Sequence, residues 1–131
     1  MIGAVQAAGA QLVVIEKREA LVDKFPDLPI TLDLSALASC NKVLCTSTTV
    51  LNDSLEDILT ICSPETFVSV IGPTAGYFPD PLFSRGVDVV GGRVVTDGPA
   101  FLKLLAERKR WGNATRKVCF QKETYPGIIM G

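Results

Sequence analysis

The sequence contains no histidine among its 131 residues. This absence excludes Ser-His-Asp and Cys-His nucleophile systems, zinc sites with histidine ligands, and acid–base catalysis by imidazole. A transition metal would therefore need cysteine, carboxylate or carbonyl donors, or donors that a cofactor brings with it.

Long hydrophobic runs are missing as well. No apolar run reaches the roughly 18 residues that a membrane span needs, and residues 1–10 lack the basic start of a secretory signal. The sequence therefore predicts a soluble, cytoplasmic protein with no membrane partner.

Cysteine is present, but without any C-x-x-C pair. Cys40 and Cys45 have C-x₄-C spacing, which permits a metal pair, although closed thiolate sites usually have tighter spacings. Burial as small apolar residues is the favoured interpretation, so we expect reduced, mostly buried thiols. The four cysteines are Cys40, Cys45, Cys62 and Cys119.

The composition, with 47% hydrophobic and 21% charged residues, is that of one globular domain. The net charge of −1 hides a basic segment at 103–122, which has seven Lys and Arg side chains and a single acidic residue, Glu107. With Trp111 this segment could contact nucleic acid through phosphates and one stacking ring. Basic residues are also favoured at a helix C-terminus, and no recognised motif is present, so we expect no nucleic-acid partner.

Hydrophobic periodicity predicts strands that alternate with helices. The expected strands are 11–15, 42–46, 66–71, 87–90, 93–96 and, at an edge, 116–120. The expected helices are 4–10, 35–40 with a cap at Asp33 or Ser35, 53–63 with Asp53 as N-cap, one of one to two turns that starts at Asp80-Pro81 and ends before Gly86, and 97–110 with Phe101, Leu102, Leu104 and Leu105 buried. Residues 17–29 are expected to form a loop with one helical turn. This alternation predicts an α/β, Rossmann-like fold: a mostly parallel sheet with helices on both faces.

Ligands of open parallel sheets bind beyond the carboxyl ends of the strands. Polar residues follow three of the predicted strands there, and the hydroxyl-rich turn after 42–46 suits an anion or a polar cofactor. The candidate ligand-binding residues are Thr46, Ser47, Thr48, Thr49, Asn52, Gly72, Pro73 and Thr74, and the candidate metal ligands are Glu16 and Asn52.

Each candidate also has a purely structural interpretation. Ser, Thr and Asn are the usual residues of turns and helix caps, and Glu16 could be an exposed residue at the start of a charged run. The loop that starts at Gly72 could be a simple strand-to-helix turn. The sequence has no G-x-G-x-x-G pattern, so a standard dinucleotide fingerprint is missing.

Two segments resemble one known family. They are TSTTVLNDSLE at 46–56 and GPTAGYFPDPLFSRGVDVVGG at 72–92. With the following 94–97 they are similar to the DUF364 family, which is described as a heavy-metal chelation domain with a Rossmann-like fold. The resemblance covers residues 2–107 and implies that Glu16, the turn at 46–49, Asn52 and the loop at 72–74 border the family's ligand cleft. Ser47 stands where glycine is common.

Longer members of that family carry an N-terminal domain similar to the enolase N-terminal domain, and the cleft lies between the two domains. The resemblance implies that residues 1–131 form the single Rossmann-like domain, without the N-terminal one and with 112–131 as a C-terminal extension. A separate N-terminal-domain partner or a second copy of the chain would then complete the cleft.

The leading functional hypothesis is a small-ligand-binding domain that binds a heavy metal or a metal-containing cofactor at the carboxyl edge of its sheet. One alternative is an enzyme domain that uses nucleotides or phosphate at the same loops. The other is a non-catalytic interaction subunit.

Overall fold

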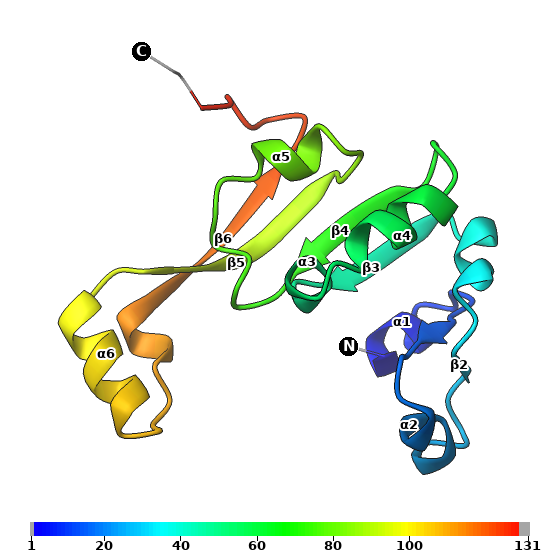
Figure 1. The fold of residues 1–131 in the computed structure, drawn as a ribbon, viewed down its shortest axis with the longest axis horizontal. Coiled ribbons are helices and arrows are strands. Elements are labelled where there is room, and N and C mark those ends of the chain that lie inside the picture. Colours follow the sequence, from blue (N-terminus) through cyan, green and yellow to red (C-terminus); the bar gives the residue numbers. More distant parts are fainter. Residues whose placement is uncertain (1, 129–131) are drawn as a thin grey trace.

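Two short segments with alternating side chains build the first half of a four-stranded sheet. In a computed structural model that describes residues 2–128, β3 (Lys42–Thr46) pairs in parallel with β4 (Phe67–Ile71). Next to β4 lies β5 (Val89–Val95), also parallel, and β6 (Thr115–Gln121) adds an antiparallel outer strand, so the order is β3-β4-β5-β6 (Figure 1). The predicted strands at 42–46 and 66–71 and the predicted edge strand are confirmed.

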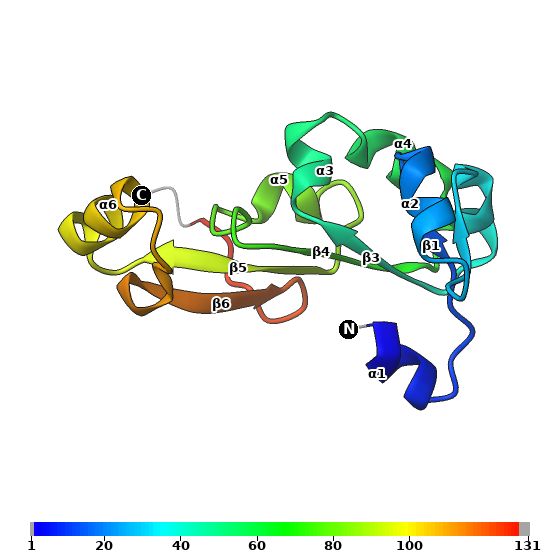
Figure 2. The same cartoon turned by 90° about the horizontal axis from the view of Figure 1, so that it is seen from below.

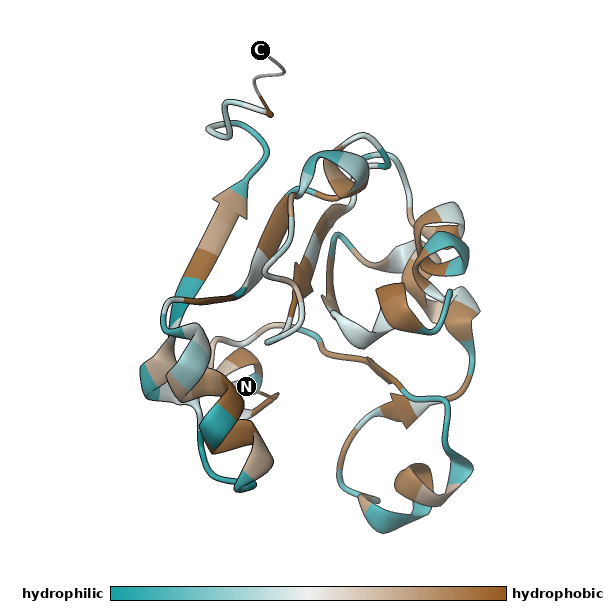
Figure 3. Cartoon of the chain, turned by 60° about the vertical axis from the view of Figure 1, so that its left-hand side comes forward, coloured by the Kyte–Doolittle hydropathy of each residue, from teal (hydrophilic) through white to brown (hydrophobic). Residues whose placement is uncertain are grey.

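One face of this sheet carries the hydrophobic core. Figure 2 shows the short helices α3 (Thr48–Leu51), α4 (Leu55–Ile61) and α5 (Asp80–Phe83) on that side. Hydrophobic residues predominate along the strands (Figure 3), because every second side chain of a half-covered strand points into the core. The buried strand residues of the core are Val43, Cys45, Val68, Val70 and Val90.

The other face of the sheet is largely uncovered. The alternate side chains Leu44, Phe67 and Ile71 are each 46% exposed, and α1 (Ile2–Ala7) is the helix that lies on this side in Figure 2. The predicted α/β class with a mostly parallel sheet is confirmed, but helix cover is unequal between the two faces. None of the helices within residues 2–128 is long and apolar enough to cross a membrane.

The N-terminal part forms its own small sheet. The strand expected at 11–15 is reduced to β1 (Val14–Ile15), which pairs in parallel with β2 (Ile30–Thr31) and not with the four-stranded sheet. The residues between them hold a six-residue helix, α2 (Glu19–Lys24), where a loop with one turn was expected. The 3₁₀ helix η1 (Leu34–Ser39) is confirmed, and Asp33 caps it.

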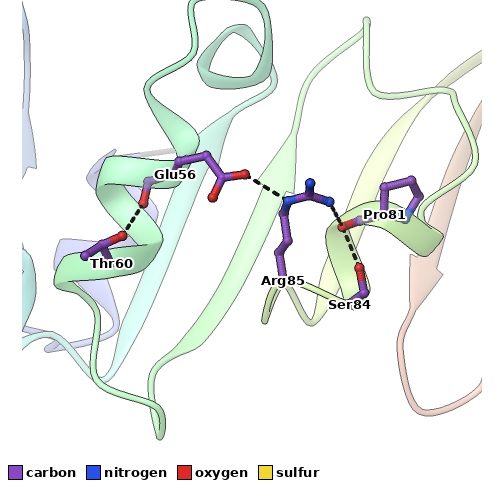
Figure 4. A network of polar contacts seen from close by, with 5 residues as sticks. All are labelled: Glu56, Thr60, Pro81, Ser84 and Arg85. Atoms are coloured by element: carbon purple, nitrogen blue, oxygen red, sulfur yellow. Dashed lines mark hydrogen bonds and ion pairs between the residues drawn. The ribbon is translucent and has the colours of Figure 1, made fainter.

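The helix expected to begin at Asp53 is present as α4, and an additional short helix, α3, forms before it in the hydroxyl-rich turn. Asp53 has φ 57° and separates α3 from α4, so the predicted N-cap role of Asp53 is wrong. Ser54 takes the cap position instead. Glu56 Oε1 accepts a hydrogen bond from Arg85 Nε at 2.8 Å, which links α4 to the end of α5 (Figure 4).

The segment after the double glycine also differs from the prediction. β5 runs unbroken through Gly91 and Gly92, where two short strands were expected. α6 (Gly98–Ala106) begins at the predicted cap Asp97 but ends before Arg110. Its expected buried face is wrong, because Leu102 and Leu105 are 65% and 51% exposed and Phe101 and Leu104 are only half-buried.

The C-terminal residues pack against α5. The hydroxyl of Tyr125 donates to Asp80 Oδ2 at 3.0 Å, and the Tyr125 ring meets Phe83 and Phe120 edge-on. Of the extension predicted for 112–131, the 3₁₀ helix η2 (Gly112–Ala114) and β6 are therefore part of the domain's own packing. Residues 129–131, like residue 1, lie outside the described part.

Candidate functional site

The hydroxyl-rich turn follows β3 directly. Thr49 Oγ1 donates to the carbonyl of Thr46 at 2.7 Å, and Thr48 Oγ1 donates to Thr46 Oγ1 at 3.2 Å. Three of the four hydroxyls, those of Thr46, Thr48 and Thr49, thus serve the turn itself, which favours the capping interpretation for them. The helix that follows, α3, has only four residues.

Ser47 connects this turn to the loop after β4. Its side chain is 2% exposed, and its Oγ lies 2.6 Å from Thr74 Oγ1. The Ser47 N–H donates to the carbonyl of Ile71 at 3.0 Å, and the Gly72 N–H donates to Gly91 at 2.9 Å. The structure therefore brings the predicted residues at 46–49 and 72–74 together at the carboxyl ends of β3 and β4.

Serine at position 47 is accommodated because position 72 is glycine. A Cβ atom at Gly72 would collide with the Ser47 hydroxyl and lie 2.9 Å from its Cβ. The buried hydroxyl takes the space that a side chain at Gly72 would need. Ser47, which stands where glycine is common in the family, is therefore accommodated by the glycine at position 72 in the neighbouring loop.

Asn52 lies at the far end of α3, in the C-cap position. Its Oδ1 accepts hydrogen bonds from the Ser54 hydroxyl at 2.6 Å and from the Ser54 N–H at 3.3 Å. The oxygen that could bind a metal is thus engaged in the turn between α3 and α4.

Glu16 follows β1, in the smaller sheet. Its Oε1 accepts from the N–H groups of Lys17 at 2.8 Å and Arg18 at 3.4 Å, so the carboxylate closes the turn before α2. Within residues 2–128 no hydrogen bond or ion pair joins Glu16 to the two loops at 46–49 and 72–74.

The donor set for a metal is incomplete on this chain. In the part that the structure describes, no three Cys, Asp or Glu side chains are grouped closely enough to hold a metal ion. The sequence adds no histidine. The residues present therefore do not fit a closed metal site, which needs about four donors for zinc and more for calcium.

The thiols behave as core residues more than as ligands. Burial raises the pKa of the Cys45 thiol to about 11, and the neighbouring Cys62 adds to this shift. Burial also raises the pKa of Cys62, with a smaller contribution from Cys40. All four cysteines are free, and Cys119 is exposed.

We expect thiol reagents at pH 8 to label Cys119 first and Cys45 only as the protein unfolds, because the thiolate is the reactive form. A Cys119→Ser variant should lose the fast phase. The raised pKa of Cys45 stabilises the fold below pH 9.0, its ordinary value, and this contribution should decline as the pH rises towards about 11. Rapid labelling of Cys45 in the folded protein, followed by mass spectrometry, would contradict this assignment.

A cavity of about 180 Å³ lies beside the loop at 72–74, and the sequence did not reveal it. Arg93, Phe101, Trp111 and Thr115 line it together with Pro73 and Thr74. The single tryptophan in the basic segment at 103–122 was a sequence signal for a binding site in this region, although it suggested contact with nucleic acid. Nothing local marked Arg93, because it meets Trp111 only after β5 pairs with β6.

Comparisons with known proteins identify a family model that matches the sequence and solved structures with a similar fold. A model of the DUF364 family, described as "Putative heavy-metal chelation", matches residues 1–123. The fold is similar to a DUF364 protein of unknown function from Pyrococcus horikoshii, with a TM-score of 0.65 and 16% identity over 83% of this chain and 54% of that one. A DUF364 protein of unknown function from Desulfitobacterium hafniense gives a TM-score of 0.62 and 19% identity over 83% and 51%.

This chain thus spans about half the length of these two solved relatives. No curated protein matches it.

Proposed function

Because this chain belongs to the DUF364 family, we propose that it is a small-ligand-binding domain that forms one wall of a heavy-metal chelation cleft. The ligand lies at the carboxyl ends of β3 and β4, against the turn at 46–49 and the loop at 72–74. The observation that carries this proposal is the 2.6 Å contact between Ser47 Oγ and Thr74 Oγ1. It holds two loops that are distant in sequence at the edge where α/β sheets bind ligands.

In this proposal, a metal takes one donor from Glu16 Oε2, which accepts no hydrogen bond within residues 2–128. Asn52 Oδ1 becomes a second donor by releasing Ser54, and the remaining donors come from elsewhere. Oxygen donors alone suit hard cations, whereas heavy metals favour softer ligands. The missing donors must therefore belong to the ligand itself, as in a metal-containing cofactor, or to another polypeptide segment.

A second segment would also cover the open face of the sheet. Parallel strands are normally buried on both faces, yet Leu44, Phe67 and Ile71 leave an apolar strip on this one. This strip supports a homo-oligomer or a separate N-terminal-domain partner as the other wall of the cleft.

Isothermal titration with Zn²⁺, Cd²⁺, Cu²⁺ and Mn²⁺ tests the metal part of the proposal. We expect a Glu16→Gln, Asn52→Ala double variant to bind the preferred ion at least about tenfold more weakly than the native chain, which is about 1.4 kcal/mol. A Glu65→Gln variant removes a carboxylate from an exposed loop residue and should leave the affinity unchanged. Equal binding of every ion by the native chain and the double variant would reject Glu16 and Asn52 as ligands.

A further inference from the structure

The cavity beside the loop at 72–74 has the construction of a binding site. It lies beyond the end of β4, where β5 extends further and pairs with β6. The rings of Phe101 and Trp111 form an edge-to-face pair in its wall, with centroids 5.4 Å apart. Pro73 and Val95 add further apolar surface. Such a wall favours a ligand with a flat or compact apolar body.

Arg93 places a positive charge in this apolar wall. Its guanidinium carbon is 5.9 Å from the centroid of the Trp111 ring. Nη1 donates to Thr115 Oγ1 at 2.7 Å and to the carbonyl of Gly112 at 3.3 Å. Both bonds leave from the same nitrogen, and they fix the plane of the guanidinium group.

The other edge of the Arg93 guanidinium is left for a ligand. Within residues 2–128 neither Nε nor Nη2 has a hydrogen-bond partner. These two nitrogens carry parallel N–H groups, which is the geometry that binds both oxygens of a carboxylate. The protein thus orients the guanidinium through Nη1 and leaves the two-pronged edge unused.

The charge around Arg93 also favours an anion. Arg93 stands directly opposite Lys117 in the antiparallel pair of β5 and β6, so the two side chains share one face of the sheet. Like charges at opposite positions destabilise a sheet. In the described part of the chain neither residue forms an ion pair. An anion bound at Arg93 would relieve this repulsion.

We propose that this cavity binds a small organic carboxylate. The carboxylate accepts hydrogen bonds from Nε and Nη2 of Arg93, and the apolar body of the ligand lies against Phe101 and Trp111. The pocket is half open to solvent, and its volume of about 180 Å³ leaves room for a body of one ring, since benzene fits an enclosed cavity of about 150 Å³ in another protein. This site requires no metal and therefore goes beyond the proposed function, although it adjoins the loop at 72–74.

Trp111 supplies the readout, because it is the only tryptophan in the chain. The whole chain is titrated with benzoate, acetate and inorganic phosphate in buffer that contains a metal chelator, so that failure of metal binding has no influence on the result. We expect benzoate to change the fluorescence saturably and to bind at least about tenfold more tightly than acetate or phosphate. Equal binding of benzoate and phosphate would overturn the proposal, because a bare charge would then account for the site.

Variants at Arg93 test the hydrogen-bonding edge. Arg93→Gln should weaken benzoate binding at least about tenfold, and Arg93→Lys should also weaken it, because lysine keeps the charge but lacks the two-pronged edge. Arg116→Gln is the matched control. It removes one charge from the neighbouring strand, at the position opposite Val94, and should change the affinity by less than about twofold. Benzoate binding that is unaffected by Arg93→Lys would overturn the assignment.

Amide chemical shifts of the native chain give a test that needs no variant to fold. Benzoate should shift the amide signals of residues 73–74, 93–95 and 111–115. Shifts that are confined to other parts of the chain would equally overturn the proposal.

Discussion

Replacing Phe83 with alanine is expected to cost about 3–5 kcal/mol of unfolding free energy. The side chain is only 7% exposed and belongs to the core beneath α5. Its ring also meets the Tyr125 ring edge-on at 5.6 Å. The substitution therefore opens a cavity and removes one of the contacts that hold the C-terminal segment to α5, while the hydrogen bond from Tyr125 to Asp80 remains.

Urea unfolding measures this loss. Phe83→Ala should lower the midpoint concentration with an unchanged slope, since the slope follows the surface exposed on unfolding. Phe78→Ala is the control, because Phe78 precedes the same helix and is 69% exposed. We expect it to change the free energy by no more than about 0.5 kcal/mol. Similar losses for the two variants would contradict the assigned core.

Helices and strands could be predicted from the sequence where residues close together in the chain determine them. Alternation predicted β3 from Lys42 to Thr46 with the bounds that the structure has. Asp97 with the following glycine and proline correctly marked the start of α6. In both cases the physical cause, side-chain alternation or capping, acts within a few residues.

Predictions failed where a distant segment decides the outcome. The apolar run at 11–15 was assigned to the main sheet, but the Val14 and Glu16 N–H groups donate to the carbonyls of Pro29 and Thr31. Alternation identifies a strand without identifying its partner, so the neighbourhood of Glu16 could not be deduced. Gly91 and Gly92 were interpreted as a break because the sequence does not reveal that both glycines pair with β6.

The candidate site shows the same division. The turn at 46–49 and the loop at 72–74 could be placed together because both follow parallel strands, and all such strands end at one edge. Arg93 and Thr115 come together through the antiparallel pairing of β5 with β6. That pairing joins residues at least 20 positions apart in the sequence, which no short motif records.

Gly92→Ala is the second substitution from which we expect a large effect. A Cβ atom at this position would overlap the carbonyl of Ala75 and the backbone nitrogen of Gly76. These are backbone atoms, and Ala75 is fully buried, so the strain cannot be relieved by rotating a side chain. We expect a loss of about 3 kcal/mol, at the upper end of the usual cost of overpacking.

This substitution also connects stability with the site. To make room for the new methyl group, the loop at 72–76 must move away from β5, which pulls Thr74 from Ser47 and alters the wall of the cavity at Arg93. We therefore expect Gly92→Ala to shift the amide signals of Ser47 and Thr74 and to weaken benzoate binding in addition to lowering the urea midpoint.

Gly3→Ala separates this close contact from the general effect of replacing a glycine. A Cβ atom at Gly3 meets nothing within 4 Å, and alanine favours the helix α1 by up to about 1 kcal/mol. The variant should be as stable as the native chain or slightly more stable. If Gly92→Ala matched it in stability, the loop at 72–76 would not rest on β5 at this point, and the geometry assigned to both the cleft and the cavity would be wrong.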